Sequence, residues 1–101
     1  QRRWLLRVLP VEKIVALVEK RRGLGWDAFR DIHGDWARDL VLYLARKRSG
    51  LTLSQIGAEL DLPEYKAVGK AVQRFEKSLA ADALRRRLVK ECMNALSLVE
   101  T

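Results

Sequence analysis

From Pro10 onward, apolar residues recur every three to four positions, and no segment alternates as a β-strand would. This spacing places apolar side chains on one face of an α-helix, which has about 3.6 residues per turn. We therefore predict an all-α fold, a small helical bundle of five to six helices. The predicted helices cover residues 10–22, 26–32, 35–48, 52–60, 63–79 and 82–99.

Capping and turn residues separate these helices. Gly23 can end the first helix, and Gly50 stands where a left-handed residue commonly ends the long helix 35–48. Asp35 and Asp82 are residue types that accept hydrogen bonds from the first N–H groups of a helix. The sequence therefore predicts a cap at the start of helices 35–48 and 82–99.

Residues 51–79 have the pattern of two helices joined by a tight break. Thr52 and Gln55 have the capping-box spacing, in which each side chain binds the backbone N–H of the other residue. Gly57 would let the second helix approach closely. The residue before Pro63 is disfavoured in the α region, so the first helix should end there and the second begin near Pro63. A short helix, a turn and a longer helix predict a helix-turn-helix, whose second helix enters the major groove of DNA.

The second of these helices has two contrasting faces. Val68, Val72, Phe75 and Leu79 lie on one face at the 3.6-residue period and predict a contact with the core. The opposite side is a basic stripe with a single amide. Such a stripe is also compatible with an ordinary solvent-exposed helix face. Its residues are Lys66, Lys70, Gln73, Arg74 and Lys77.

Charge and length agree with a small nucleic-acid binder. The 101 residues contain 20 Lys and Arg against 13 Asp and Glu, a net charge of +7, and are 49% hydrophobic. This size suits one domain spanning residues 1–101, and the excess of positive charge favours a polyanionic partner. Residues 1–9 are either a linker from a preceding domain or a helical turn that docks on the bundle. A start at Gln1 without methionine suggests a piece of a larger protein.

The sequence contains few of the residue types that commonly carry out catalysis or bind metals. His33 is the single histidine and Cys92 the single cysteine, so we expect no metal site, no cofactor and no small-molecule substrate. Cys92 falls on an apolar helix face, which favours a buried filler. No run approaches the roughly 18 apolar residues that a membrane span requires. We expect a non-catalytic, cytoplasmic and nucleoid-associated protein without a membrane partner.

Several short motifs resemble the C-terminal domain of prokaryotic REP-associated tyrosine transposases. This resemblance implies an accessory DNA-binding domain of a transposase-like protein. It also implies that the paired-histidine metal site and the tyrosine nucleophile of that family belong to a separate N-terminal domain. The matching segments are Trp26-x-x-Phe29, residues 33–39, Leu42-Tyr43-Leu44, residues 50–57, Tyr65-x-Ala67-Val68 and residues 71–76.

The same layout is similar to the C-terminal DNA-binding domain of the replication initiator DnaA and, more distantly, to the Trp repressor fold. Both resemblances imply a helical bundle with a helix-turn-helix. The Arg-Asp-His-Thr-Thr-Val motif of the initiator corresponds to Pro63–Val68, where only the valine is retained. The base-reading residues of the initiator are therefore not carried over to this chain.

From these patterns we predict that the basic stripe faces duplex DNA. Gln73 can pair with adenine and a lysine can reach guanine, so Tyr65, Lys66 and Gln73 are the candidates for base contacts. The predicted phosphate contacts are Lys77, Arg46, Lys47 and Arg48, helped by Thr52 or Ser54 at a helix N-terminus.

Two other functions stay open from the sequence. One is a protein-interaction or dimerisation module, in which the last helix binds a second copy through Leu84, Leu88, Val89, Met93 and Leu96. The other is a promoter-reading domain of the sigma-factor kind. Arg46, Lys47 and Arg48 would also complement the negative end of their own helix without any partner.

Overall fold

The computed structural model describes residues 9–99, with side chains up to residue 96. Within that range the chain forms helices joined by short turns, without a β-strand. The all-α prediction with five to six helices is confirmed. Of the predicted segment 1–9, only Leu9 is described; it is buried and its N–H binds the Arg48 carbonyl at 2.9 Å. The helices are α1 (Val11–Arg22), α2 (Trp26–Phe29), α3 (Trp36–Arg48), α4 (Leu53–Glu59), α5 (Tyr65–Ala81) and α6 (Ala83–Val99).

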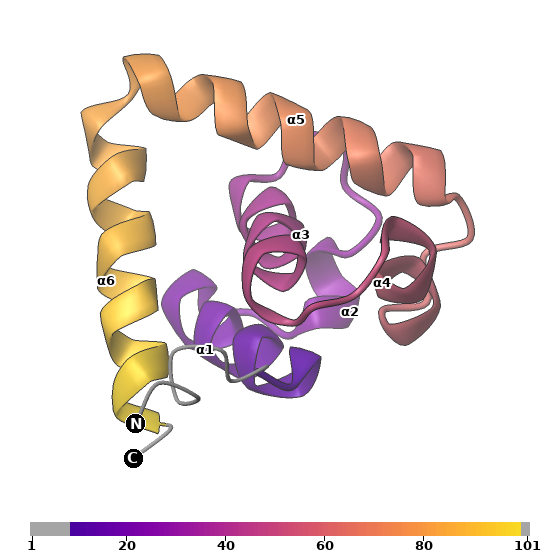
Figure 1. The fold of residues 1–101 in the computed structure, drawn as a ribbon, viewed down its shortest axis with the longest axis horizontal. Coiled ribbons are helices and arrows are strands. Elements are labelled where there is room, and N and C mark those ends of the chain that lie inside the picture. Colours follow the sequence, from indigo (N-terminus) through magenta and orange to yellow (C-terminus); the bar gives the residue numbers. More distant parts are fainter. Residues whose placement is uncertain (1–8, 100–101) are drawn as a thin grey trace.

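Helix α3 lies at the centre of the bundle (Figure 1). It packs against α1 on one side and α5 on the other, while α4 and the short α2 close a third side. After α5 the chain turns sharply, and α6 runs along α1 and the end of α5. This arrangement leaves α5 along one edge of the molecule, with only its inner face covered.

The central position of α3 follows from its composition. Every residue from Ala37 to Ala45 is buried, because apolar residues cover almost the whole circumference of the helix. Phe29 from α2 and Phe75 from α5 are fully buried against it. Tyr43 and Phe75 pack with ring centroids 5.0 Å apart, so an aromatic contact joins α3 to α5.

The predicted helix caps are present. The Thr52 hydroxyl accepts the Gln55 N–H at 3.1 Å, and the Gln55 side chain accepts the Thr52 N–H at 2.9 Å. Asp35 accepts the N–H groups of Ala37 and Arg38, which caps α3. Gly23 and Gly50 have φ angles of 77° and 66°, which is the left-handed conformation that glycine adopts without strain.

Three predicted boundaries were wrong by two to three residues, and one of them is the end of α5, at Ala81 rather than at residue 79. Helix α2 ends at Phe29 rather than at residue 32, and the carbonyl of the next residue, Arg30, accepts a hydrogen bond from the Arg38 side chain at 2.7 Å. Helix α5 begins at Tyr65 rather than near Pro63. Glu64 has an extended backbone and its carbonyl accepts the N–H groups of Ala67 and Val68, so Pro63 belongs to the turn.

The turn between α4 and α5 leaves no room for a side chain at Gly57. The Leu62 N–H binds the Gly57 carbonyl at 2.8 Å, and Asp61 between them has a φ of 57°. A Cβ atom on Gly57 would lie 2.9 Å from the Leu62 carbonyl oxygen. The predicted close approach at Gly57 is therefore to the turn itself, and it sets how α5 leaves α4.

Candidate nucleic-acid interface

Four residues of the predicted basic stripe form the solvent-facing side of α5. The buried residues of this helix are Val68, Ala71, Val72 and Phe75. With 100° of rotation per residue, the side of α5 opposite these buried residues is represented by an arc of about 60°. That arc contains Lys66, Lys70, Gln73 and Lys77, which are all exposed, and which we call the outer ridge.

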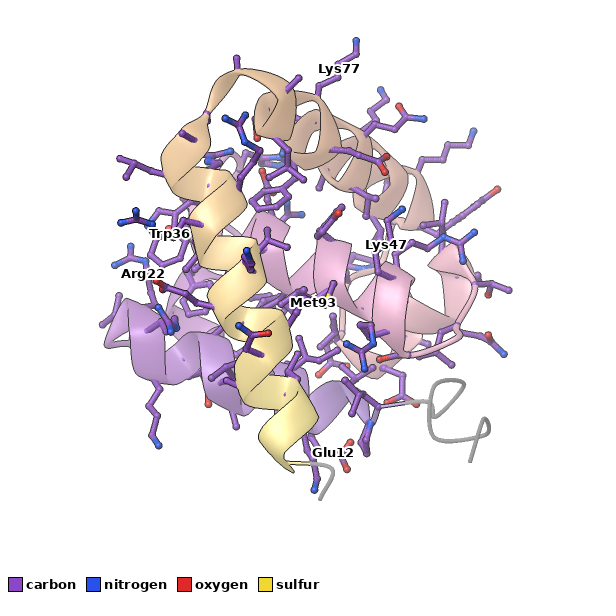
Figure 2. All side chains as sticks on the ribbon, turned by 60° about the vertical axis from the view of Figure 1, so that its left-hand side comes forward. Glu12, Arg22, Trp36, Lys47, Lys77 and Met93 are labelled. Atoms are coloured by element: carbon purple, nitrogen blue, oxygen red, sulfur yellow. The ribbon has the colours of Figure 1, made fainter. Side chains whose placement is uncertain are left out.

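The three lysines of the outer ridge have no hydrogen-bond or ion-pair partner among residues 9–96. Figure 2 shows Lys77 pointing away from the bundle, on the side of α5 that α6 does not cover. With a rise of about 1.5 Å per residue, the ridge from Lys66 to Lys77 is about 16 Å long. It is an elongated row of uncompensated positive charge along one edge of the molecule.

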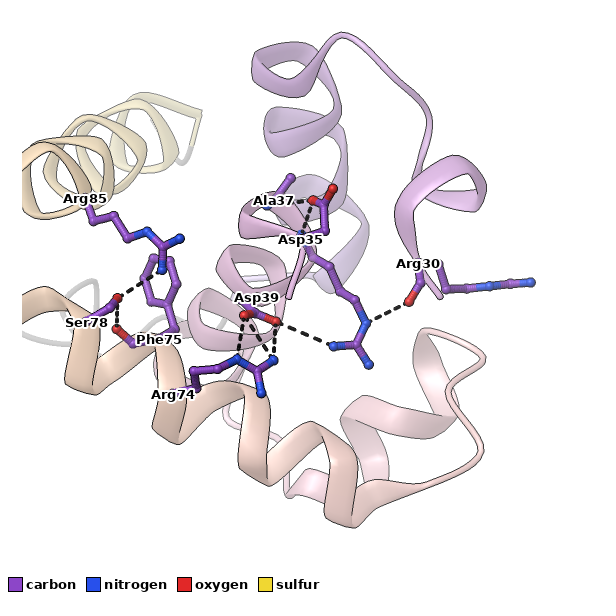
Figure 3. Close-up of polar contacts among 9 residues, drawn as sticks. Arg30, Asp35, Ala37, Asp39, Arg74, Phe75, Ser78 and Arg85 are labelled. Carbon is purple, nitrogen blue, oxygen red and sulfur yellow. Dashed lines mark hydrogen bonds and ion pairs between the residues drawn. The ribbon is translucent and has the colours of Figure 1, made fainter. Parts of the chain in front are cut away.

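Arg74, which was also predicted to face the duplex, turns to the flank of α5 instead. Its Nη2 atom lies 3.2 Å from both carboxylate oxygens of Asp39, and its Nε atom lies 3.3 Å from one of them (Figure 3). Asp39 is 2% exposed and comes from the central helix α3. This pair ties α5 to α3, so DNA contact by Arg74 stays a prediction that the outer ridge does not require.

A second guanidinium belongs to the same cluster. Arg38 is 5% exposed, its Nε donates to the Arg30 carbonyl, and its Nη1 lies 3.5 Å from Asp39. The Asp39 carboxylate therefore lies between two arginines, Arg38 from within the core and Arg74 from the surface (Figure 3). The adjacent charges Arg38 and Asp39 inside an otherwise apolar helix are a sequence signal for this cluster, and our prediction missed their role.

The predicted phosphate cluster at the end of α3 is not a single patch. Arg46 donates to the Leu51 carbonyl at 3.0 Å, and Lys47 pairs with Glu76 of α5 at 3.1 Å. Arg48 is half-buried and contacts the sulfur of Met93 on α6 at 3.3 Å. Only Arg46 and Lys47 are exposed, and their exposed contacts are weak enough to be exchanged for a phosphate.

The remaining predicted contacts are exposed. Thr52 and Ser54 stand at the N-terminus of α4, where Thr52 already accepts the Gln55 N–H. Tyr65 opens α5 with 51% of its surface exposed. Tyr65 precedes Lys66 of the outer ridge, while Thr52 and Ser54 lie at the start of α4, which packs against α5.

Residues 9–99 contain few groups that could bind a metal ion or act as a nucleophile. These residues contain no group of three or more His, Cys, Asp or Glu side chains that could hold a metal ion. His33 is exposed in the loop before α3, and Cys92 is buried as predicted. Burial raises the pKa of the Cys92 thiol, which disfavours the reactive thiolate. No helix in this range has the length and apolar character to cross a membrane.

The fold and its surface thus define an all-α bundle with a lysine-rich outer helix. No family model, curated protein or solved structure matches this chain.

Proposed function

We propose that this chain is a non-catalytic DNA-binding module that places α5 in the major groove of a duplex. The observation that carries the proposal is the outer ridge, whose lysines are exposed and have no partner among residues 9–96. A row of cations that the protein itself does not neutralise is the surface that a polyanion compensates.

The shape of α5 supports a groove rather than a flat contact. An α-helix with its side chains is about 10–12 Å across, and the major groove of B-DNA is about 12 Å wide. Because α5 lies along an edge of the bundle, its outer side can enter a groove without a collision with α1 or α6 (Figure 1). The turn at Gly57 fixes how far α5 projects beyond α4.

The ridge supplies groups for both parts of DNA recognition. Lys70 and Lys77 suit phosphate oxygens, and Arg46 and the N-terminus of α4 are further candidates for phosphate contacts. Gln73 stands between the lysines and has the donor and acceptor pair that matches adenine, while Lys66 can reach guanine. We propose that Gln73 and Lys66 give sequence preference and that the other contacts give affinity.

The resemblance to transposase domains suggests where such a module acts. We propose that it is the accessory C-terminal domain of a transposase-like protein and that it brings a separate nuclease domain to DNA. In this proposal the chain associates with the nucleoid and carries no catalytic group of its own.

A pair of matched double variants tests the interface. Lys66→Ala with Lys70→Ala removes two charges from the outer ridge, while Lys13→Ala with Lys20→Ala removes two exposed charges from α1. Both proteins have the same net charge, so only the position of the lost charges differs. Fluorescence anisotropy with a labelled duplex should show roughly tenfold or greater weakening for the ridge variant alone, since each base contact contributes about 1–3 kcal/mol.

The salt dependence gives a second measurement. Three to four ion contacts predict that log K falls with log salt at a slope of roughly −3 to −4 for the unmodified chain. The ridge variant should have a shallower slope. Equal weakening in both double variants would mean that net charge alone attracts DNA, and unchanged binding in the ridge variant would remove α5 from the interface.

A further inference from the structure

The apolar side of α6, predicted as a dimer contact, is already covered within the chain. Cys92 and Leu96 are buried, while Leu88, Val89 and Met93 pack partly buried against the same core. Leu84 is the exception, with 76% of its surface exposed. A second copy therefore cannot bind this side unless α6 first leaves its own bundle.

The corner between α5 and α6 is unusual because no helix-breaking residue makes it. Asp82 is the single residue between α5 and α6, and it has an extended backbone with φ −120° and ψ 101°. The residues from Ser78 to Arg85 include no glycine or proline, and most are alanine or leucine, which are strong helix formers. Apart from the capping side chain of Asp82, the local sequence therefore suits a continuous helix, so the bend depends on that cap and on the side chains around it.

Side chains from the first turn of α6 hold the corner closed. The Asp82 carboxylate accepts the Arg85 N–H at 3.1 Å. The Arg86 guanidinium donates to the carbonyls of Leu79 and Ala80 at the end of α5, at 2.6 and 3.2 Å. Arg85 also donates to the Ser78 hydroxyl at 3.1 Å (Figure 3). These bonds replace the helical bonds that a straight α5–α6 would make.

We propose that α6 exchanges between two copies of this chain. In the exchanged dimer Asp82 becomes helical, α5 and α6 form one continuous helix, and the α6 of each copy packs on the α1 and α5 of the other. The core contacts of α6 are the same in both forms, so the balance depends on the corner and on protein concentration. This inference goes beyond the proposed function and does not depend on DNA binding.

Exchange is favoured by the position of α6 in the fold. Its partners α1 and α5 also contact the central helix α3. Removal of α6 therefore leaves the α1–α3–α5 packing in place and uncovers an apolar surface that the α6 of a second copy can cover with the same contacts.

The exposed ion pair between Arg21 of α1 and Glu91 of α6, 2.9 Å apart, marks the contact that is exchanged. We would prepare two chains in a Cys92→Ala background, one with Arg21→Cys and the other with Glu91→Cys. The chains are mixed at high concentration, warmed below the unfolding transition, cooled and treated with a short bismaleimide. Exchange predicts a covalent pair made of one chain of each kind, since only exchange brings position 91 of one copy to position 21 of another.

Substitution at the corner should change the yield of that pair. Asp82→Ala removes the cap of α6 and adds a strong helix former, so we expect the dimer fraction in sedimentation to rise roughly tenfold. Asp82→Asn keeps a capping side chain and should stay within about twofold of the unmodified chain.

A chain with both cysteines is the positive control, because it should cross-link internally as a monomer. If that control reacts and no mixed pair forms with either the native corner or Asp82→Ala, the proposal is wrong. A dimer in sedimentation that gives no mixed cross-link would be an ordinary surface dimer, and it would also contradict exchange. The mixture with the native corner decides the question even if Asp82→Ala fails to fold.

Discussion

The two sides of α5 use the same kind of residue in opposite ways. On the outer ridge, Lys66, Lys70 and Lys77 extend into solvent without a partner among residues 9–96. One step around the helix, Arg74 turns back and binds the buried carboxylate of Asp39. Both sets belong to one basic stripe in the sequence, and only the structure separates them.

The difference teaches which positive charges are available to a ligand. A carboxylate that is 2% exposed has lost most of its hydration, and bonds from arginine offset that loss. Withdrawal of Arg74 toward a phosphate would leave Asp39 with Arg38 alone. The lysines of the outer ridge have no hydrogen-bond or ion-pair partner among residues 9–96 to lose when they bind DNA, and they are therefore the better candidates for its interface.

Replacement of Asp39 should disrupt the inward-facing cluster of Arg38, Asp39 and Arg74, and it has the largest expected effect on stability. Asp39→Ala leaves Arg38 buried without its carboxylate, and loss of one partner of a buried ion pair typically costs about 3–5 kcal/mol. We expect urea denaturation to show a loss of stability in this range. Asp31→Ala removes the same charge at an exposed position before α3. Its stability should stay within about 0.5 kcal/mol of that of the unmodified chain. A loss below about 1 kcal/mol for Asp39→Ala would mean that the cluster is not a structural element.

Arg74 and Lys77 allow a direct comparison of the two sides. Arg74→Gln removes a bond to Asp39 and should lower stability by about 1–2 kcal/mol, whereas Lys77→Gln should change it by less than about 0.5 kcal/mol. For DNA binding the order should reverse. Lys77→Gln should make the slope of log K against log salt shallower by about 1, and Arg74→Gln should leave that slope unchanged.

The two measurements need conditions in which both variants are fully folded, which circular dichroism can establish before each titration. If Arg74→Gln reduces the salt slope as much as Lys77→Gln does, Arg74 leaves Asp39 to bind DNA. The comparison between the two sides of α5 would then not hold in the complex.

The sequence predicted the features that depend on local spacing. The period of the apolar residues identified the buried face of α5, and Thr52, Asp35 and Asp82 each cap the helix that they were predicted to cap. These predictions succeed because a cap or a helix face involves residues within a few positions of one another. The outer ridge follows from the same periodicity, and so most of the candidate site was visible before the fold was known.

The features that failed depend on contacts between distant residues. Arg74 binds a residue 35 positions earlier, so its direction cannot be obtained from the period of α5. The Arg30 carbonyl just after α2 is bound by the side chain of Arg38, eight residues later, and the helical period does not reveal this contact. The same applies to Lys47 and Arg48, which bind α5 and α6 respectively, while the preceding residue Arg46 binds the nearby Leu51 carbonyl before α4.

Asp35 and Arg22 form a second inward-facing ion pair. Its removal has the smallest expected effect on stability. Burial acts to raise the pKa of the Asp35 carboxyl, but hydrogen bonds from Arg22 and from the N–H groups of Arg38 and Ala37 outweigh it and hold the pKa below its usual value of 3.8. A depressed pKa in the folded state means that the ionised group adds stability above its unfolded pKa, and that this stability is lost as the pH falls through the folded value.

Asp35→Asn keeps an N-cap on α3 and removes the charge that Arg22 binds, so we expect a loss of about 1 kcal/mol at pH 7. The gap between the two proteins should narrow as the pH falls below about 3.9, where the unmodified chain begins to lose the same charge. Urea denaturation at pH 7, 5 and 3 measures it. Asp27→Asn, at an acid whose side chain is 89% exposed, should show no such dependence on pH. If the difference in stability between the unmodified chain and Asp35→Asn grew in acid, the charged carboxylate would destabilise the folded chain. The inward-facing charges could then not be distinguished from those of the outer ridge by their contribution to stability.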